Sequence, residues 1–404
     1  MIMSKRTQKI FDPDATGPLQ GVRVVDMSRL VAGNMSTHVL ADYGADVIKI
    51  ERPGSGDDLR NWRCEDIEIY WKTYSRNKRS FAVDLKSEEG RQNLIELIST
   101  AQILVENFVP GTLEKWGLGA SDLYEINPKL IILRISGWGQ DGPFSHRPGF
   151  GTLVEAMSGW AYLNGHADKP PTLPPLAMAD MVAGLYGVGA VLTALRVVEV
   201  EGGDGQVIDL SLFEPILSII GSEAAQCSLT GKATMRAGNQ SSHTAPRNVY
   251  VCADGGYVAL SGSMQSMAMR IFDTIGHPEL KFDPKFATND ERVAHRDELD
   301  EIIGAFIVKM TCEEALTLFE AEGVTVGPVC SMAELMEHSY VVGREVLVDL
   351  PDAEMGSVPM HNVVPRFSGT PGVFRRPAPE LGEHNDEIIQ EIRSRRLAKK
   401  GDGE

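Results

Sequence analysis

The chain has 404 residues, of which 43 % are hydrophobic and 24 % charged, a composition typical of a globular protein long enough for two domains. Its 39 basic and 56 acidic residues give a net charge of −17, which argues against a nucleic-acid-binding surface. An anionic ligand held by a local cluster of Arg and Lys is compatible with that charge.

The N-terminal stretch MIMSKRTQKIFDPDATG has no apolar core, so we expect no signal peptide. No uncharged apolar run reaches the roughly 20 residues that span a bilayer, and residues 181–195 come closest. The cysteines form no CxxC pair, which predicts neither a zinc site nor a disulfide framework and favours a reducing, cytoplasmic setting. They are Cys64, Cys227, Cys252, Cys312 and Cys330.

The first 140 residues alternate short β-rich runs with helical patterns, which predicts an α/β fold with a parallel sheet. We expect strands at Gly21–Met27, Ala45–Glu51, Gln102–Phe108 and Lys129–Ser136, and helices within 32–44 and 87–100. In such a sheet the ligand site lies beyond the carboxyl ends of the strands.

The turns after these four strands are rich in Gly and Pro and suit a cleft lined by backbone. They read SRLVAG, ERPGSGDD, ENFVPG and GWGQDGP, in chain order. None of them follows its strand with the G-x-G-x-x-G pattern, so a dinucleotide fingerprint is absent. Taken singly, each is also explained by ordinary turn chemistry.

Asp180 stands directly before Met181–Leu195, a run that carries no charge. A carboxylate buried alone is costly, so it must be hydrogen-bonded, shifted in pKa or used for chemistry. Two interpretations are open on these residues alone. Asp180 is either the N-cap of a helix ADMVAGLYGVGAVLTAL or a reactive group.

The chain changes character near residue 200. The segment GDGQVIDLSLFEP predicts a strand-like run before a helix, and TGKATMRAGNQSSHTAPRN predicts a long loop. The segment VYVCADGGYVALSG predicts a hairpin that turns at Asp254-Gly255-Gly256. Thr311 and Glu314 have the spacing of a capping box. We expect a large domain of residues 1–222 with 346–404 and a small α/β domain of residues 223–345. The basic tail is expected to be a solvated helix end: Arg393, Arg395, Arg396, Lys399 and Lys400.

Taken in order, several segments resemble the family III CoA-transferases, a group that also includes the α-methylacyl-CoA racemases. These segments are PLQGVRVVDMSRLVAG, GADVIKIERPGSGDD, VENFVPGTLEKWGLG, ISGWGQDGP, LAMADMVAGLYGVGAVLTAL and LGEHNDEII. The resemblance implies a Rossmann-like large domain, a smaller domain and an interlocked homodimer. It also implies that the substrates are an acyl-CoA thioester and a small carboxylic acid, with no tightly bound cofactor and no metal.

Asp180 stands where this family has its nucleophile, in the aD-x-x-aG segment. A carboxylate can attack a thioester, become a mixed anhydride and then an aspartyl-CoA thioester, and an incoming acid repeats the exchange. Backbone N–H groups in glycine-rich turns are suitable donors to the oxyanions that form.

The resemblance also implies contacts with CoA. Val31 and Ala32 match backbone that lines the pantetheine and thioester, and Arg52 matches a cation near the adenine and phosphates. Asn107 and Phe108 match the turn on the nucleotide side.

Further cations are candidates for the phosphates. Lys115 stands where the formyl-CoA enzyme has an Arg, so charge is kept but bidentate geometry is not. Arg76, Lys78 and Arg79 could add a local positive field, and Arg79 is the contact that we predict. As an isolated cluster these three residues also fit a solvated turn.

The racemase branch carries G-H-D shortly after the GP turn, and its His moves a proton. Here Phe150 and Gly151 occupy the His and Asp positions, and a phenyl ring cannot transfer a proton. His146 lies four residues early and is interpreted as incidental. Many transferases keep an acid where Gly151 stands, so this part of the site is altered.

The sequence therefore predicts a CoA-transferase that acts through Asp180, with succinyl-CoA as the donor and a small dicarboxylic acid as the acceptor. Intramolecular CoA migration or acyl-CoA isomerisation is the alternative. A catalytically silent acyl-CoA-binding protein is the second alternative. We expect no nucleic acid and no membrane as partners.

Overall fold

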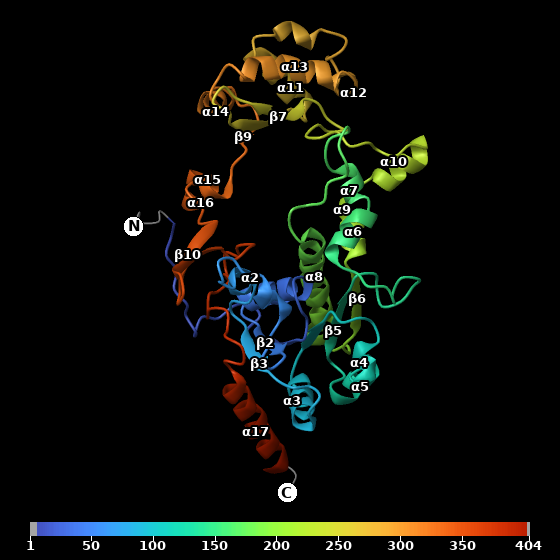
Figure 1. The fold of residues 1–404 in the computed structure, drawn as a ribbon, viewed down its shortest axis with the longest axis vertical. Coiled ribbons are helices and arrows are strands. Elements are labelled where there is room, and N and C mark those ends of the chain that lie inside the picture. Colours follow the sequence, from blue (N-terminus) through green and yellow to red (C-terminus); the bar gives the residue numbers. More distant parts are fainter. Residues whose placement is uncertain (1–5, 402–404) are drawn as a thin grey trace. The chain divides into compact units, whose positions relative to one another are not determined.

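The computed structural model describes residues 6–401, and it divides into two compact units (Figure 1). The first unit comprises the chain up to Ser158, Pro174–Ile220 and the chain from Ser339 onward. The second comprises Gly159–Leu173 and Gly221–His338. The boundaries expected from the sequence stay a prediction.

A six-stranded sheet forms the centre of the first unit, and all its neighbouring strands are parallel. The order is β3-β2-β1-β4-β5-β6. The strands are β1 Arg23–Asp26, β2 Asp46–Glu51, β3 Arg79–Ala82, β4 Ile103–Glu106, β5 Ile131–Ser136 and β6 Val207–Ser211. The α/β class and the parallel sheet are confirmed, whereas β3 was not among the strands predicted from the sequence.

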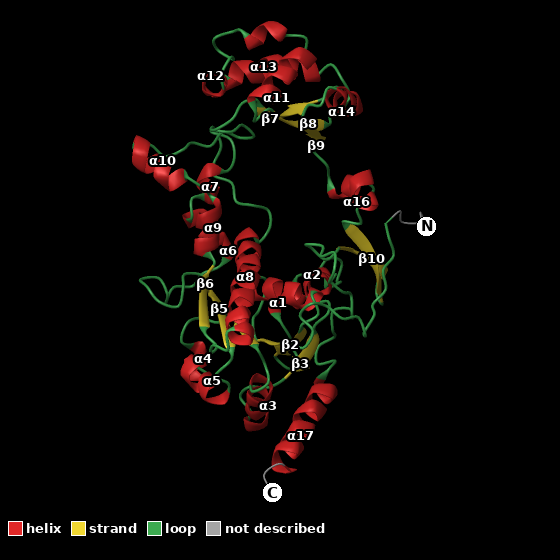
Figure 2. Ribbon diagram, turned by 180° about the vertical axis from the view of Figure 1, so that it is seen from behind, coloured by secondary structure: helices red, strands yellow, loops and turns green. Residues whose placement is uncertain are grey.

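Helices cover both faces of this sheet (Figure 2). Alternate strand residues such as Val25, Leu104 and Ile132 share one core with α3 (Glu88–Ile98), α5 (Ala120–Ile126) and α17 (Asn385–Gly401). On the other face α1 (Ala32–Asp42) packs against α8 (Met178–Val200), which also contacts β5 and β6. This alternation follows from side chains pointing to opposite faces along a strand.

Close packing of α1 on α8 depends on glycine. A Cβ at Gly184 would lie 2.7 Å from the Cβ of Met35, and the Gly184 carbonyl accepts a hydrogen bond of 2.8 Å from the Ser36 hydroxyl. A larger residue at 184 would therefore push the two helices apart. Gly184 fixes the distance between α8, which carries Asp180, and α1, which follows β1.

Smaller elements complete the first unit. They are the 3₁₀ turn η1 Asp58–Asn61, α2 Ile69–Tyr74, α4 Thr112–Lys115, α6 Gly151–Met157, α9 Phe213–Ile219, α16 Ser339–Gly343 and the hairpin β10 Leu347–Asp352 with β11 Gly356–His361. The exposed side chains of Arg393 and Arg395 on α17 fit the solvated helix end expected there, whereas Arg396 is half-buried and pairs with Glu96 at 3.4 Å. The side chains of Lys399 and Lys400 lie outside the described residues.

The second unit contains a three-stranded antiparallel sheet in the order β7-β8-β9. Its strands are β7 Arg247–Val251, β8 Tyr257–Ser261 and β9 Val326–Pro328. Its helices are α7 Trp160–Leu163, α10 Glu223–Thr230, α11 Gln265–Thr274, η2 Pro278–Lys281, α12 Asn289–Ala294, α13 Arg296–Ile307, α14 Cys312–Ala321 and α15 Met332–Leu335. The predicted hairpin is confirmed, and so is the capping box of Thr311 and Glu314 at the start of α14.

The basic cluster before β3 is buried, so its interpretation as a solvated turn was wrong. Arg76 and Lys78 have no exposed surface. Arg76 pairs with Asp42 at 2.6 Å, and Lys78 lies 3.3 Å from Asp26. Carboxylates from distant parts of the sequence surround these cations, which is the condition under which charged side chains can be buried.

Candidate active site

A cavity of about 640 Å³ lies at the carboxyl ends of the parallel strands. Its walls come from the segments that follow β1, β2, β3 and β4, which is where open α/β sheets bind ligands. The lining residues include Ser28, Arg29, Arg52, Pro53, Val83, Asp84, Lys86, Arg91, Phe108, Lys115 and Trp116. We refer to it as the cationic cavity.

The cationic cavity combines positive charge with flat aromatic surface. Arg29 stacks over the ring of Phe108 at 5.5 Å, and Phe108 meets Trp116 edge to face at 5.1 Å. The Arg52 side chain is 62 % exposed, and its long ion pair with Asp58, at 3.8 Å, leaves most of the guanidinium open to a ligand. Guanidinium groups and aromatic rings in this arrangement suit a phosphorylated nucleotide.

Asn107 ties together two of the loops that form this edge of the sheet. Its Oδ1 accepts a hydrogen bond of 2.8 Å from the backbone N–H of Arg29, and its Nδ2 donates one of 2.7 Å to the Arg29 carbonyl. Because β1 and β4 are neighbours in the sheet, this clamp fixes the loops that follow them. The strand order changes direction at this point, which is where ligands bind in such folds.

A smaller cavity of about 190 Å³ adjoins the first, and Arg29 lines both. We refer to it as the carboxylate cavity because Asp180 lies in its wall. Its other lining residues include Leu30, Ala32, Asp58, Asn107, Ser136, Gly137, Gly149, Phe150 and Leu212. The arrangement places the Asp180 carboxylate beside a cation-rich pocket, as a reaction on the end of a long anionic ligand requires.

Asp180 is the third residue of α8, so its interpretation as the N-cap was wrong. The N-cap position is taken by Ala177, whose side chain makes no capping hydrogen bond. The helix begins earlier than the charge pattern indicated. Asp180 lies in the first helical turn, where the helix dipole favours a negative charge.

The carboxylate of Asp180 occupies space that a side chain at position 151 would fill. A Cβ on Gly151 would lie 2.3 Å from Asp180 Oδ2, far inside normal contact. Burial, and after it the negative charge of Glu155, together raise the pKa of Asp180 to about 6. The side chain is therefore a carboxylate of increased basicity that is ionised at neutral pH.

The structure brings together most of the residues predicted for the site. Ala32, Asn107 and Asp180 line the carboxylate cavity, while Arg52, Phe108 and Lys115 line the cationic cavity. Val31 is buried at the start of α1, between two residues of the carboxylate cavity. Arg79 instead turns into ion pairs with Asp46, Glu387 and Glu391, at 2.7, 2.9 and 2.6 Å.

Two cations of the cationic cavity were missed by the sequence reasoning. Lys86 follows β3 and Arg91 belongs to α3. Lys86 could have been found from the strand at 79–82, because the turn that follows a strand of this sheet forms a wall of the site. Sequence reasoning also missed Glu155, which lies on α6 beside the start of α8.

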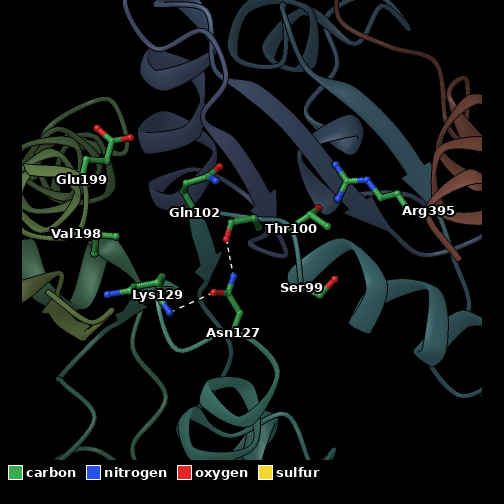
Figure 3. A pocket seen from close by; sticks show the side chains of 9 residues that line it. Ser99, Thr100, Gln102, Asn127, Lys129, Val198, Glu199 and Arg395 are labelled. Atoms are coloured by element: carbon green, nitrogen blue, oxygen red, sulfur yellow. Dashed lines mark hydrogen bonds between the residues drawn. The ribbon is translucent and has the colours of Figure 1, made fainter. Parts of the chain in front are cut away.

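Another cavity, of about 590 Å³, lies at the opposite edge of the same sheet (Figure 3). Its walls are segments that precede β4 and β5 and the ends of α8 and α17: Ser99, Thr100, Ala101, Gln102, Asn127, Lys129, Val198, Glu199 and Arg395. The amino ends of parallel strands are not where such folds bind substrates. Within residues 6–401, no group of three His, Cys, Asp or Glu side chains could hold a metal ion.

Comparison with known proteins defines the class of this chain. Residues 19–385 match CoA-transferase family III, and the chain belongs to this family. It is an enzyme that transfers CoA.

Individual relatives share nearly the whole length of the chain. It is 36 % identical over 378 residues to succinyl-CoA–D-citramalate CoA-transferase of Chloroflexus aurantiacus, covering 93 % of this chain and 94 % of the relative. It is 34 % identical to succinyl-CoA:glutarate CoA-transferase of Mus musculus, covering 94 % and 88 % of the two chains. A crystal structure of a CaiB/BaiF family protein from Brucella suis superposes with a TM-score of 0.82 at 32 % identity, covering 94 % and 100 %.

Proposed function

We propose that the enzyme moves CoA from succinyl-CoA to a small free carboxylic acid through covalent intermediates on Asp180. The observation that carries this proposal is the position of the Asp180 carboxylate in a cavity that Arg29 connects to the cationic cavity. The relatives are named as succinyl-CoA-dependent transferases to citramalate, malate or glutarate, which supports the choice of donor.

The reaction requires no net proton transfer and no external energy. An oxygen of Asp180 attacks the thioester carbonyl carbon, the C–S bond breaks, and CoA leaves as a thiolate while a mixed anhydride forms. The thiolate then attacks the aspartyl carbonyl, which frees succinate and leaves an aspartyl-CoA thioester. The acceptor carboxylate repeats both steps in reverse, takes the CoA and restores Asp180.

The two cavities divide the work of binding. We propose that Arg52, Lys86, Arg91 and Lys115 hold the phosphates of CoA and that the ring of Phe108 contacts the adenine, since cations and aromatic surface meet there. The backbone of Val31 and Ala32, with Asn107, then lines the pantetheine and thioester near Asp180. Arg79 has no part in this proposal because its guanidinium is committed to ion pairs.

The residue at position 150 favours CoA transfer over racemisation. Phe150 lines the carboxylate cavity where a racemase would place its proton-transferring His, and its ring has no titratable group. An isomerase of that type needs a second acid or base on the opposite side of the substrate. Exchange of the α-proton of an acyl-CoA with deuterated solvent would support the isomerase instead.

The direct experiment crosses a panel of CoA thioesters with free acids and reads products by mass spectrometry. Transfer from succinyl-CoA to a dicarboxylic acid is expected. During turnover, hydroxylamine or borohydride should trap a single residue, Asp180. Asp180→Asn should fold, bind CoA thioesters and lose several orders of magnitude in turnover. Trapping at another carboxylate, or substantial transfer by Asp180→Asn, would contradict the mechanism.

We also propose a homodimer, because α8 has an apolar surface that the first unit leaves uncovered. Large apolar side chains are exposed on α8 and on α9, which packs against it: Leu185, Tyr186, Leu192, Leu217 and Ile219. By length and composition α8 is the one helix of the described chain that could span a membrane, with 33 % of its apolar window buried. Buried helices of soluble proteins pass the same test, and a second copy would cover this surface.

Sedimentation velocity tests the dimer. A single dimeric species down to nanomolar concentration is expected from an interlocked pair, and a freely exchanging monomer would count against it. Flotation with liposomes checks the membrane alternative.

The cysteines bear on the cellular setting. All five are unpaired, which supports the proposal of a reducing, cytoplasmic setting: Cys64, Cys227, Cys252, Cys312 and Cys330.

A further inference from the structure

Glu155 is a buried carboxylate next to the candidate nucleophile. It lies on α6 with 3 % of its surface exposed. Among the residues that the structure describes, no cation forms an ion pair with it. A buried charge without a counter-ion destabilises a fold, so its presence needs another explanation.

The hydrogen bond of Glu155 places it at the start of α8. Its Oε1 accepts a hydrogen bond of 2.9 Å from the backbone N–H of Ala179, the residue before Asp180. The N-cap residue Ala177 offers no side-chain acceptor, so the free N–H groups of the first turn need one from elsewhere. Glu155 supplies it across the contact of α6 with α8.

The charges around Asp180 leave Glu155 without compensation. Arg29 and Asp58 face the same cavity, and Asp58 pairs with two cations, Arg29 at 3.7 Å and Arg52 at 3.8 Å. The ion pairs of these two arginines are therefore with Asp58 and not with Glu155. The negative charge of Glu155 raises the pKa of Asp180, in addition to the effect of burial.

We propose that Glu155 is a positioning residue that anchors the first turn of α8 and, through its charge, increases the reactivity of the Asp180 carboxylate toward the thioester. This inference rests on the proposed function of Asp180. Like charges destabilise the free carboxylate, and the repulsion disappears when Asp180 becomes a neutral anhydride or thioester. Glu155 thus favours the covalent intermediates over the free enzyme.

Two variants separate the charge from the hydrogen bond. Glu155→Gln keeps the length and the oxygen acceptor but removes the charge, whereas Glu155→Ala removes both. Glu199→Gln is the matched control, because it makes the same change on α8, the helix that carries Asp180, about 28 Å from Asp180 at a rise of 1.5 Å per residue. Glu199 lies at the opposite edge of the sheet (Figure 3).

The assay is exchange of carbon-14 succinate into succinyl-CoA, followed from pH 4.5 to 8. For Glu155→Gln, the acid limb of kcat/KM should move to lower pH, on the order of one unit, because the pKa of Asp180 falls. Intact-protein mass spectrometry after mixing with succinyl-CoA should show several-fold less aspartyl-CoA thioester than in the wild type. Glu155→Ala should in addition lower the maximal rate, and Glu199→Gln should match the wild type.

Each contrary result has a distinct meaning. An unchanged acid limb and an unchanged fraction of intermediate in Glu155→Gln would overturn the inference, while leaving the role of Asp180 intact. Loss of fold in Glu155→Gln, seen by circular dichroism while Glu155→Asp folds, would reduce Glu155 to a structural residue and overturn it as well. Exchange by Asp180→Asn would instead overturn the proposed function itself.

Discussion

Replacing Asn107 by Ala should uncouple the loops after β1 and β4 without unfolding the protein. The variant loses both hydrogen bonds to the backbone of Arg29, of 2.8 and 2.7 Å. Each such bond contributes a net 0.5–1.5 kcal/mol, and partial exposure places these at the lower end, so about 1–2 kcal/mol of loop order is lost. At about 1.4 kcal/mol per factor of ten, kcat/KM for succinate exchange should fall roughly 5- to 30-fold.

Asn127→Ala provides the matched control for this prediction. Asn127 lies at the opposite edge of the sheet (Figure 3) and also clamps backbone there. Its Nδ2 donates to the carbonyls of Ile98 and Ala101 at 3.1 and 2.7 Å. Both variants should lose comparable free energy of unfolding in urea titrations, but only Asn107→Ala should lose activity. Equal kcat/KM in Asn107→Ala and wild type would refute the assignment of this edge as the active site.

Three further outcomes are expected. The kcat/KM of the wild type should fall as the pH drops through about 6, because the raised pKa of Asp180 leaves the nucleophile protonated below that value; a flat profile from pH 5 to 7 would contradict this. Arg52→Ala and Lys115→Ala should raise KM for succinyl-CoA about tenfold with kcat nearly unchanged, and the salt dependence of kcat/KM should weaken; effects on kcat alone would place the phosphates elsewhere. Lys78→Met should lower the free energy of unfolding by about 3 kcal/mol in urea titrations, because it leaves the buried Asp26 with one cation fewer. A loss below about 1 kcal/mol would be inconsistent with the buried pair.

Local patterns in the sequence were sufficient for much of the first unit. The strands β1, β2, β4 and β5 are short segments dominated by Val, Ile and Leu, and turn residues follow each of them. Each could therefore be predicted from its own residues. The hairpin and the capping box were predicted for the same reason, because turn chemistry and capping depend on neighbours in the chain. The resemblance of the turn motifs then indicated Asp180.

Elements stabilised by partners far away in the sequence could not be predicted from local patterns. The strand β3 contains Arg79 and Ser80, and it lacks a continuous apolar run. Both side chains are buried because they meet carboxylates elsewhere: Arg79 pairs with Asp46, and the Ser80 hydroxyl donates to Glu51. Charge in a sequence normally indicates solvent, so Arg76 and Lys78 were misread for the same reason.

The sequence by itself determined the class of fold, the positions of the turns that form the cavities and the carboxylate expected to react. Only the tertiary structure decided that Asp180 lies beside Gly151, that Glu155 accepts the N–H of Ala179, and that Arg29 lines both cavities. The physical reason is the separation in sequence between the residues that interact. Secondary structure and turns follow from interactions between neighbours in the chain, whereas the charge felt by a nucleophile depends on which helices pack against it.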